Sequence, residues 1–336
     1  QVRALCDLSL RQAFGGTELV GTQDKPWLFL KEISSNGNMQ TVDVIYPSSP
    51  AFLYANPLML RLLLEPLFDY AEHGGWPKVF AQHDLGASYP NATGHNDGIE
   101  EDMPVEESAN MILMTAAYLA AAPKEEAAAY AKTHYAILKQ WADYLLPNTL
   151  DPEFQNQTDD FTGFIGHSAN LALKGIIALG AMGQVSERAG NAADGTTYKQ
   201  AATDLIGKWV KLAHDPTEPH LVLAYDQPGT WSLKYNAFFD KLLGLDLIPT
   251  SVLEEEASWY LLNQNAFGIP LDPRHTYTKA DWELFTAAST PNAMLRQNLL
   301  DRVYRFATES PSRVPFSDWY DTAANTSVGF RARPVM

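Results

Sequence analysis

The chain has 336 residues, 46% of them hydrophobic and 19% charged, which is typical of a folded globular protein and excludes a disordered one. The formal net charge of −16 argues against a nucleic-acid partner, because few basic residues are present to neutralise a phosphate backbone. No apolar run reaches the ~20 residues of a membrane span, and Cys6, the single cysteine, excludes an internal disulfide. We therefore expect a soluble globular protein without nucleic-acid or membrane partners.

The first third of the chain shows helical periodicity with one interruption. Residues 1–14 carry apolar side chains at helical spacing, and an extended stretch is expected over 41–46. Asn56 and Pro57 supply an N-cap and a first-turn proline for a helix that ends at the two glycines of 74–75. Because the sequence opens inside a helical pattern without a signal peptide, we expect a segment of a longer precursor.

The rest of the chain repeats pairs of helices. One helix is predicted after Pro104 over 105–122, Pro123 breaks it, and a second follows over 124–146. Two long helices with so short a link must lie antiparallel. The same pattern predicts three further pairs, which are 163–182 with 196–213, 233–246 with 251–265, and 281–289 with 291–308. We therefore predict an all-α fold of five helical hairpins.

Long loops rich in Pro, Gly and aromatic residues separate the hairpins. Loops beyond ~12–15 residues are uncommon unless they are functional or disordered, and the aromatic content argues against disorder. Loops gathered at one end of a ring of hairpins would form one acidic and aromatic pocket. The loop segments richest in such residues are 83–86, 94–102, 159–161, 227–231, 272–277 and 316–320.

Several strings in these loops are distinctive. They are LKEISSNG at 30–37 with TVDV at 41–44, HDLG at 83–86, EDMPVEES at 101–108, TDDF at 158–161, QPGTWSLKYN at 227–236, LDPRHTY at 271–277 and VGFRARPV at 328–335. In this order, over nearly the whole chain, they resemble the fungal secreted glutaminase A family.

The resemblance implies a six-hairpin (α/α)6 toroid with long functional loops at one end. It implies that 1–336 is a single helical catalytic domain of a longer chain that also has an N-terminal β-rich region. The implied reaction is hydrolysis of L-glutamine to L-glutamate and ammonia, with glutamine and the missing N-terminal region as partners. The count of five hairpins is one short, and the missing N-terminal part or residues beyond 336 would complete the sixth. The resemblance assigns no catalytic residue.

The chemistry of amide hydrolysis points to the loop carboxylates. The reaction needs activated water or a nucleophile, an acid for the departing ammonia, and donors for the oxyanion. Carboxylates far outnumber histidines in the loops, so we predict a carboxylate pair that acts on water. The candidates, expected to face one cavity, are Asp84, Glu101, Asp160 and Asp318.

Each of these acids also has a structural interpretation. Asp84 can cap a turn, and Glu101 and Asp160 precede helix starts, where acids favour the helix dipole whatever the function. Glu106 and Glu107, in a first helical turn, have the same interpretation. Asp318 lies among aromatic residues, which raise the pKa of a carboxyl or bury it as a hydrogen-bonding acid.

A glutamine site also needs groups for the α-carboxylate and walls for the pocket. Arg and Lys bind carboxylates, and Trp and Tyr can form walls. Ser34 and Ser35 are an alternative source of a nucleophile or oxyanion donor. The predicted substrate-binding residues are Ser34, Asn36, Trp231, Lys234, Arg274 and Tyr277.

The sequence predicts no metal site and no cofactor, because metalloprotease, P-loop and dinucleotide motifs are absent. The resemblance implies a secreted, extracellular protein, and sequons at Asn91, Asn156 and Asn325, of which about two are expected by chance, are its candidate glycosylation sites. Two alternative functions stay open. One is a glycoside hydrolase, since toroids of helical hairpins with paired acids often act on sugars. The other is a non-catalytic binding module of a larger protein.

Overall fold

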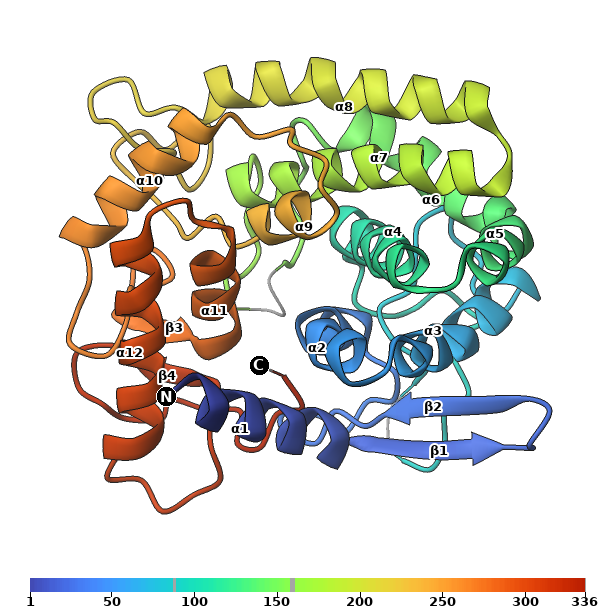
Figure 1. Ribbon diagram of the computed structural model, residues 1–336, viewed down its shortest axis with the longest axis horizontal. Coiled ribbons are helices and arrows are strands. Elements are labelled where there is room, and N and C mark those ends of the chain that lie inside the picture. The colour runs from blue at the N-terminus through green and yellow to red at the C-terminus, as the bar shows by residue number, and fades with distance from the viewer. Residues whose placement is uncertain (87–88, 158–160, 336) are drawn as a thin grey trace.

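The helices form a ring around a packed centre, as the computed structural model shows for residues 1–86, 89–157 and 161–335 (Figure 1). Helix makes up 53% of the chain, far above the ~30–35% of an average globular protein, which confirms the all-α prediction. In chain order the helices are α1 (Val2–Gly15), α2 (Val42–Ala55), α3 (Pro57–Glu72), α4 (Pro104–Ala121), α5 (Lys124–Thr133), α6 (Tyr135–Asn148), α7 (Ala169–Ala189), α8 (Ala192–Ala213), α9 (Ala237–Leu242), α10 (Thr250–Leu262), α11 (Ala280–Ser289) and α12 (Ala293–Glu309).

Successive helices pair into hairpins, each with an inner and an outer helix. The pairs are α2 with α3, α4 with α5 and α6, α7 with α8, α9 with α10, and α11 with α12 (Figure 1). Nearly every residue of α4 and α7 is buried, whereas α8 and α12 bury only one stripe. α1 packs against both α2 and α12 and so closes the ring between the first and last hairpins. Four of these five hairpins are the predicted pairs. In the first, α3 pairs with α2 and not with the helix expected over 1–14, which is α1 and takes the sixth place in the toroid.

α2 begins where the sequence predicted an extended stretch, so that prediction is wrong. Val42 and Val44 are β-branched and favour strand locally, but both are fully buried among the neighbouring helices. Tertiary packing therefore outweighs the local preference. Pro50 cannot donate to the carbonyl of Tyr46, and the hydroxyl of Ser49 donates to that oxygen at 2.8 Å instead.

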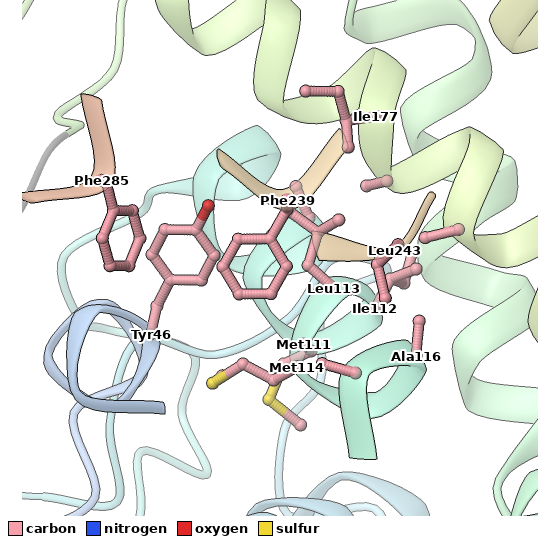
Figure 2. Packing of buried hydrophobic residues seen from close by; sticks show 14 of the residues in the cluster. Tyr46, Met111, Ile112, Leu113, Met114, Ala116, Ile177, Phe239, Leu243 and Phe285 are labelled. Atoms are coloured by element: carbon pink, nitrogen blue, oxygen red, sulfur yellow. The ribbon is translucent and has the colours of Figure 1, made fainter. Parts of the chain in front are cut away.

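A large hydrophobic core lies inside the ring and includes Tyr46 of α2 (Figure 2). The Tyr46 ring stacks on Phe239 of α9 with centroids 4.8 Å apart, and it meets Phe285 of α11 edge-on at 6.0 Å. α4 adds Met111 and Met114 to the same core. Such aromatic pairs contribute ~0.5–1.5 kcal/mol each beyond their buried area. Side chains from four inner helices therefore hold the ring together from within.

Two small antiparallel sheets accompany the helices. β1 (Thr17–Gly21) pairs with β2 (Pro26–Leu30), which packs on α3. β3 (Tyr277–Lys279) runs directly into α11 and pairs with β4 (Trp319–Asp321), so it ties the C-terminal segment to the ring. In the part of the chain that the structure describes, no helix has the length and apolar character to cross a membrane.

The long loops all lie at the end of the ring where the inner helices begin. Short links, such as Gly190 with Asn191 between α7 and α8, join each inner helix to its outer partner. The long loops lead from an outer helix to the next inner one. Because the two helices of a hairpin run in opposite directions, these long loops share one end, as the sequence predicted. Their described residues are 73–86 with 89–103, 149–157 with 161–168, 214–236 and 263–276.

Candidate active site

The first turns of the inner helices carry buried acids at this loop end. Asp43 lies in the first turn of α2, Glu106 and Glu107 in that of α4, and Asp281 in that of α11. None of the four is more than 2% exposed. A helix N-terminus favours negative charge, but complete burial of a charge is costly unless it is paired or neutralised. With their partners they form what we call the polar cluster: Glu32, Asp43, His83, Asp84, Glu106, Glu107, Lys174, Lys279, Asp281, Asp318 and Arg333.

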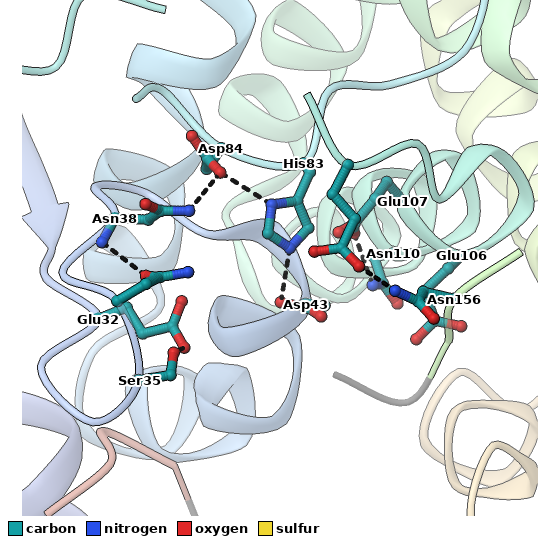
Figure 3. Close-up of polar contacts among 12 residues, drawn as sticks. Glu32, Ser35, Asn38, Asp43, His83, Asp84, Glu106, Glu107, Asn110 and Asn156 are labelled. Carbon is teal, nitrogen blue, oxygen red and sulfur yellow. Dashed lines mark hydrogen bonds and ion pairs between the residues drawn. The ribbon is translucent and has the colours of Figure 1, made fainter. Parts of the chain in front are cut away.

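His83 connects two groups of carboxylates in the polar cluster (Figure 3). Its Nδ1 lies 2.8 Å from Asp84 Oδ2, and its Nε2 lies 3.7 Å from Asp43 Oδ1. Asp84 also accepts a hydrogen bond from Asn38 Nδ2 at 2.7 Å, and its Oδ1 lies 2.7 Å from His95 Nε2. Burial alone would raise the pKa of Asp84, but the hydrogen bonds from the two histidines outweigh it and lower that pKa. Asp84 is therefore an ionised group that orients His83.

Asp43, His83 and Glu107 bring three oxygen and nitrogen atoms close together. One carboxylate oxygen of each acid and one ring nitrogen of His83 lie within 4.8 Å of one another. Asn110 Nδ2 donates to Glu107 Oε2 at 3.0 Å. Among the described residues, Glu107 Oε1 and Asp43 Oδ1 have no hydrogen-bond partner although both are buried. These oxygens are acceptors that this part of the cluster leaves open.

Burial and mutual repulsion set the protonation of this group. Burial raises the pKa of Asp43 to about 6, although the charges of His83 and Arg333 lower it. Burial also raises the pKa of Glu107 well above its ordinary value, and the negative charge of Asp43 adds to that rise. For His83, burial lowers the pKa, but the surrounding carboxylates raise the pKa by a larger amount. The net shift of the His83 pKa is therefore upward.

Lys174 of α7 is a fully buried lysine that faces α4. Its Nζ donates to Glu106 Oε1 at 2.5 Å and to Asn110 Oδ1 at 2.8 Å, and it lies 3.9 Å from the centroid of the Tyr46 ring. Charge-assisted hydrogen bonds of this kind are about twice as strong as neutral ones. Through Lys174, these contacts connect α7 with α4 and with Tyr46 of the hydrophobic core.

A second group of charges surrounds the start of α11. Lys279 Nζ lies 3.0 Å from Asp281 Oδ2 and 3.2 Å from Asp318 Oδ2, and all three side chains are fully buried. Arg333 Nη2 lies 3.3 Å from Glu32 Oε1. Burial raises the pKa of Asp318, although the charges of Lys279 and Arg333 lower it. The positive charge of Arg333 lowers the pKa of both Asp43 and Asp318, which links the two halves of the polar cluster electrostatically.

The four predicted catalytic acids have different surroundings. Asp84 and Asp318 both belong to the polar cluster, where Asp84 contacts histidines and Asp318 contacts Lys279. Glu101 is exposed, accepts a hydrogen bond from Asn156 and is not one of the buried residues of the polar cluster. Asp160 lies outside the described residues. That all four face one cavity stays a prediction.

The two cations predicted for the substrate carboxylate are already paired. Arg274 donates to both carboxylate oxygens of Asp272, at 2.8 and 2.6 Å, and its side chain is 37% exposed near the loops. Lys234 is buried against α10, where its Nζ donates to the carbonyl of Ser232 at 2.9 Å and lies 3.9 Å from Glu256 Oε2. Burial lowers the pKa of Lys234 to about 8.

The other predicted substrate residues also lie apart. Trp231 is 6% exposed and packs on Tyr260 of α10, on the same side as Lys234. Tyr277 of β3 meets the ring of Trp319 edge-on at 5.3 Å. Ser34 has a buried hydroxyl without a hydrogen-bond partner among the described residues, whereas Asn36 is exposed. Ser34 and Tyr277 keep positions near the loop end of the ring.

Sequence reasoning missed most of the polar cluster. Glu106 and Glu107 were interpreted as dipole acids, and Asp43 fell in the segment expected to be extended. Lys174 did leave a signal, because it is the single charged residue in 169–186, a stretch otherwise apolar or neutral. A lone lysine in such a helix must find a buried partner, which here is Glu106.

The three sequons differ in how free their amide nitrogens are. Asn91 is exposed. Asn156 Nδ2 donates to Glu101, and Asn325 Nδ2 donates to the carbonyl of Glu309 at 3.0 Å. A glycan on either of the last two would replace a hydrogen bond, so Asn91 is the best acceptor of the three.

A ring of helical hairpins with a buried polar centre at its loop end defines an (α/α)6 toroid. The chain belongs to the family described as the Glutaminase A six helical-hairpin domain, and the match covers residues 1–336.

Named relatives agree with this family. The chain is 43% identical to Glutaminase A of Aspergillus oryzae over 99% of its own length and 48% of that protein. It is 35% identical to a probable glutaminase of Arthroderma benhamiae over 98% of its own length and again 48% of the relative. The chain therefore spans about half the length of the curated relatives it matches.

Solved structures share the fold. An uncharacterized conserved protein from Thermus thermophilus has a TM-score of 0.59 at 11% identity, over 99% of this chain and 97% of that one. A GH78 family rhamnosidase of a Bacillus species also has a TM-score of 0.59, at 14% identity, over 88% of this chain and 29% of the rhamnosidase. At such low identities these likenesses concern the fold alone.

Proposed function

We propose that this chain is the helical half of an enzyme that hydrolyses the side-chain amide of L-glutamine to L-glutamate and ammonia. The observation that carries the proposal is the 43% identity with Glutaminase A of Aspergillus oryzae over 99% of the chain. The polar cluster at the loop end supports it, because amide hydrolysis needs acids, cations and water close together.

The polar cluster suggests a division of roles. Asp318 is the acid that protonates the departing nitrogen, since burial raises its pKa and so favours a proton on it. Lys279 and Arg333 supply the positive charge that stabilises the oxyanion or holds the α-carboxylate of glutamine. We place the attacking water beside Asp43 and Glu107, whose oxygens are open acceptors among the described residues.

The test uses protein expressed from its full coding sequence and measures ammonia release from L-glutamine with a coupled glutamate dehydrogenase assay. We expect Asp318→Asn to lose ~10²–10⁴-fold in kcat with its circular dichroism spectrum unchanged. Glu283→Gln removes an equally buried carboxylate outside the polar cluster and should keep the parental kcat. An Asp318→Asn variant as active as the parent would remove Asp318 from the mechanism.

The same assay separates the alternative functions. Release of reducing sugar from a panel of glycosides, without ammonia from glutamine, would replace the proposal with a glycoside hydrolase. A full-length protein inert towards both would support a binding module. Parallel assays with glutamine-containing peptides show whether the substrate is the free amino acid.

We also propose that the protein is secreted and glycosylated as part of a longer chain with an N-terminal β-rich region. The exposed sequon at Asn91 and the twofold length of the relatives support this. Mass spectrometry of the protein from its native source tests both points. Absence of glycan from culture-supernatant protein, or absence of the protein from the supernatant, would contradict them.

A further inference from the structure

The possible metal-ligand atoms of Asp43, His83 and Glu107 are spaced differently from the atoms of an ordinary ion pair. The His83 Nε2 to Asp43 Oδ1 distance is 3.7 Å, which is too long for a hydrogen bond. Two ligands bound to one Zn²⁺ at ~2.1 Å in a tetrahedron stand ~3.4 Å apart. The observed spacing therefore fits two ligands of a shared ion better than it fits a direct bond. All three side chains are buried, so bulk water does not satisfy them.

A neighbouring trio of the same chemical type gives the contrast. Asp84, His95 and Glu100 also offer two carboxylates and an imidazole within 4.8 Å of one another. There, however, His95 Nε2 lies 2.7 Å from Asp84 Oδ1 and 3.2 Å from Glu100 Oε2. At 2.7 Å, His95 and Asp84 form a direct hydrogen bond and are closer together than the ~3.4 Å between two ligands of one Zn²⁺. His83 and Asp43 therefore have the spacing of two ligands of one ion, whereas His95 and Asp84 do not.

The surroundings of His83 are those of a metal ligand. Its Nδ1 forms a 2.8 Å hydrogen bond with Asp84, and a carboxylate at one ring nitrogen directs the lone pair of the other towards a metal (Figure 3). Asn110 in turn orients Glu107 through Oε2 and leaves Oε1 open. With a cation bound, two ionised carboxylates and a neutral imidazole would carry two negative charges, which one divalent cation balances. No compact motif reveals this set, because its members come from three distant segments.

We propose that Asp43, His83 and Glu107 form a binding site for one divalent transition-metal cation, with Zn²⁺ as the best fit. One nitrogen and two oxygen ligands are a set that Zn²⁺ accepts, and three protein ligands leave a fourth position for water. Binding is inferred from the geometry alone. Only the further step, in which the bound cation would activate the attacking water, rests on the proposed glutaminase function.

The experiment measures Zn²⁺ binding without reference to activity. Protein from the full coding sequence is stripped with a chelator, exchanged into chelator-free buffer and titrated with ZnCl₂ by isothermal calorimetry. Mass spectrometric metal analysis after gel filtration then gives the stoichiometry. We expect one tightly bound Zn²⁺ per chain in the parent and in Glu283→Gln, the matched variant of a buried acid elsewhere. Asp43→Asn and Glu107→Gln keep the side-chain shape but remove a ligand charge. Each should lose the one tightly bound Zn²⁺.

A variant next to the proposed ligands keeps the test informative if Asp43→Asn or Glu107→Gln does not fold. Asp84→Asn changes a hydrogen-bond partner of His83 but keeps all three proposed ligands, and it should weaken Zn²⁺ binding ~10–100-fold. Circular dichroism confirms that each variant compared is folded. The proposal is overturned if the parent retains no zinc, or if every folded variant of Asp43, Glu107 and Asp84 binds it like the parent.

The outcomes for metal and for function are separate. If zinc-free protein hydrolyses glutamine at the parental rate, the glutaminase proposal stands. The bound cation then has no part in activating the attacking water. Stoichiometric zinc in a full-length protein that never releases ammonia keeps the metal site and refutes the proposed function.

Discussion

Glu283 offers a direct test of the electrostatic reasoning because it is buried outside the polar cluster. It lies on α11 with no exposed surface, and its Oε1 accepts a hydrogen bond from the backbone N–H of Ile269 at 2.5 Å. Burial raises the pKa of Glu283 to about 8, although that hydrogen bond and the charge of Arg302 lower it. At neutral pH the folded protein therefore keeps this carboxyl largely protonated.

The direction of the pH effect follows from the raised pKa. The folded state binds a proton more tightly than the unfolded state, where the pKa of Glu283 is 4.5. This stabilising contribution is fully present below pH 4.5 and is lost as the pH rises through about 8. At ~1.4 kcal/mol for each pH unit, the gap corresponds to about 3–5 kcal/mol lost by pH 9. Glu283→Gln is a neutral isostere that never carries the charge.

The expected result is a variant whose advantage grows with pH. Urea unfolding at pH 5, 7 and 9 should show Glu283→Gln within about 1 kcal/mol of the parent at pH 5 and more stable by about 3–5 kcal/mol at pH 9. Glu125 is exposed on α5, and Glu125→Gln should follow the parent at every pH. A difference between Glu283→Gln and the parent that stays constant from pH 5 to pH 9 would refute the reasoning.

Three further substitutions test other parts of the structure by urea unfolding. Lys174→Met should lower the free energy of unfolding by ~3–5 kcal/mol, because it leaves the buried Glu106 without its cation. The double variant Lys174→Met with Glu106→Gln should recover part of that loss. Trp141→Ala should cost ~3–5 kcal/mol, since its fully buried ring would leave a cavity between α6 and the core. Asn292→Ala should cost only ~1 kcal/mol, because it removes the N-cap bond to Leu295 N–H. Equal losses for Asn292→Ala and Trp141→Ala would contradict this ranking.

Much of the fold could be predicted because helix starts and stops leave local signals. Asn56 caps α3 and Pro123 separates α4 from α5, both where the sequence indicated. The helix predicted over 124–146 is divided at His134 into α5 and α6. The start of α2 was predicted wrongly, because local propensity says nothing of burial by neighbouring helices.

The candidate site was harder to predict, because it depends on which helix starts meet. Asp84 and Asp318 were singled out from their local surroundings, and both belong to the polar cluster. The roles of Asp43, Glu107 and Lys174 could not be read locally. A first-turn acid looks the same in sequence whether it faces solvent or the enclosed centre of a ring. Only the closure of the toroid brings α2, α4, α7 and α11 together at one end.

The energetics of this centre argue that it is kept for chemistry and not for stability. Asp43, Glu107, Lys174, Lys279 and Asp318 are ionisable and no more than 2% exposed. Removing each charge from water costs several kcal/mol, and well-packed apolar residues in their place often give an equally or more stable protein. A sequence selected for stability alone would have replaced them. Because they converge where the inner helices begin, with acceptor oxygens left open on Asp43 and Glu107, the structure maintains a costly set of groups poised for a ligand.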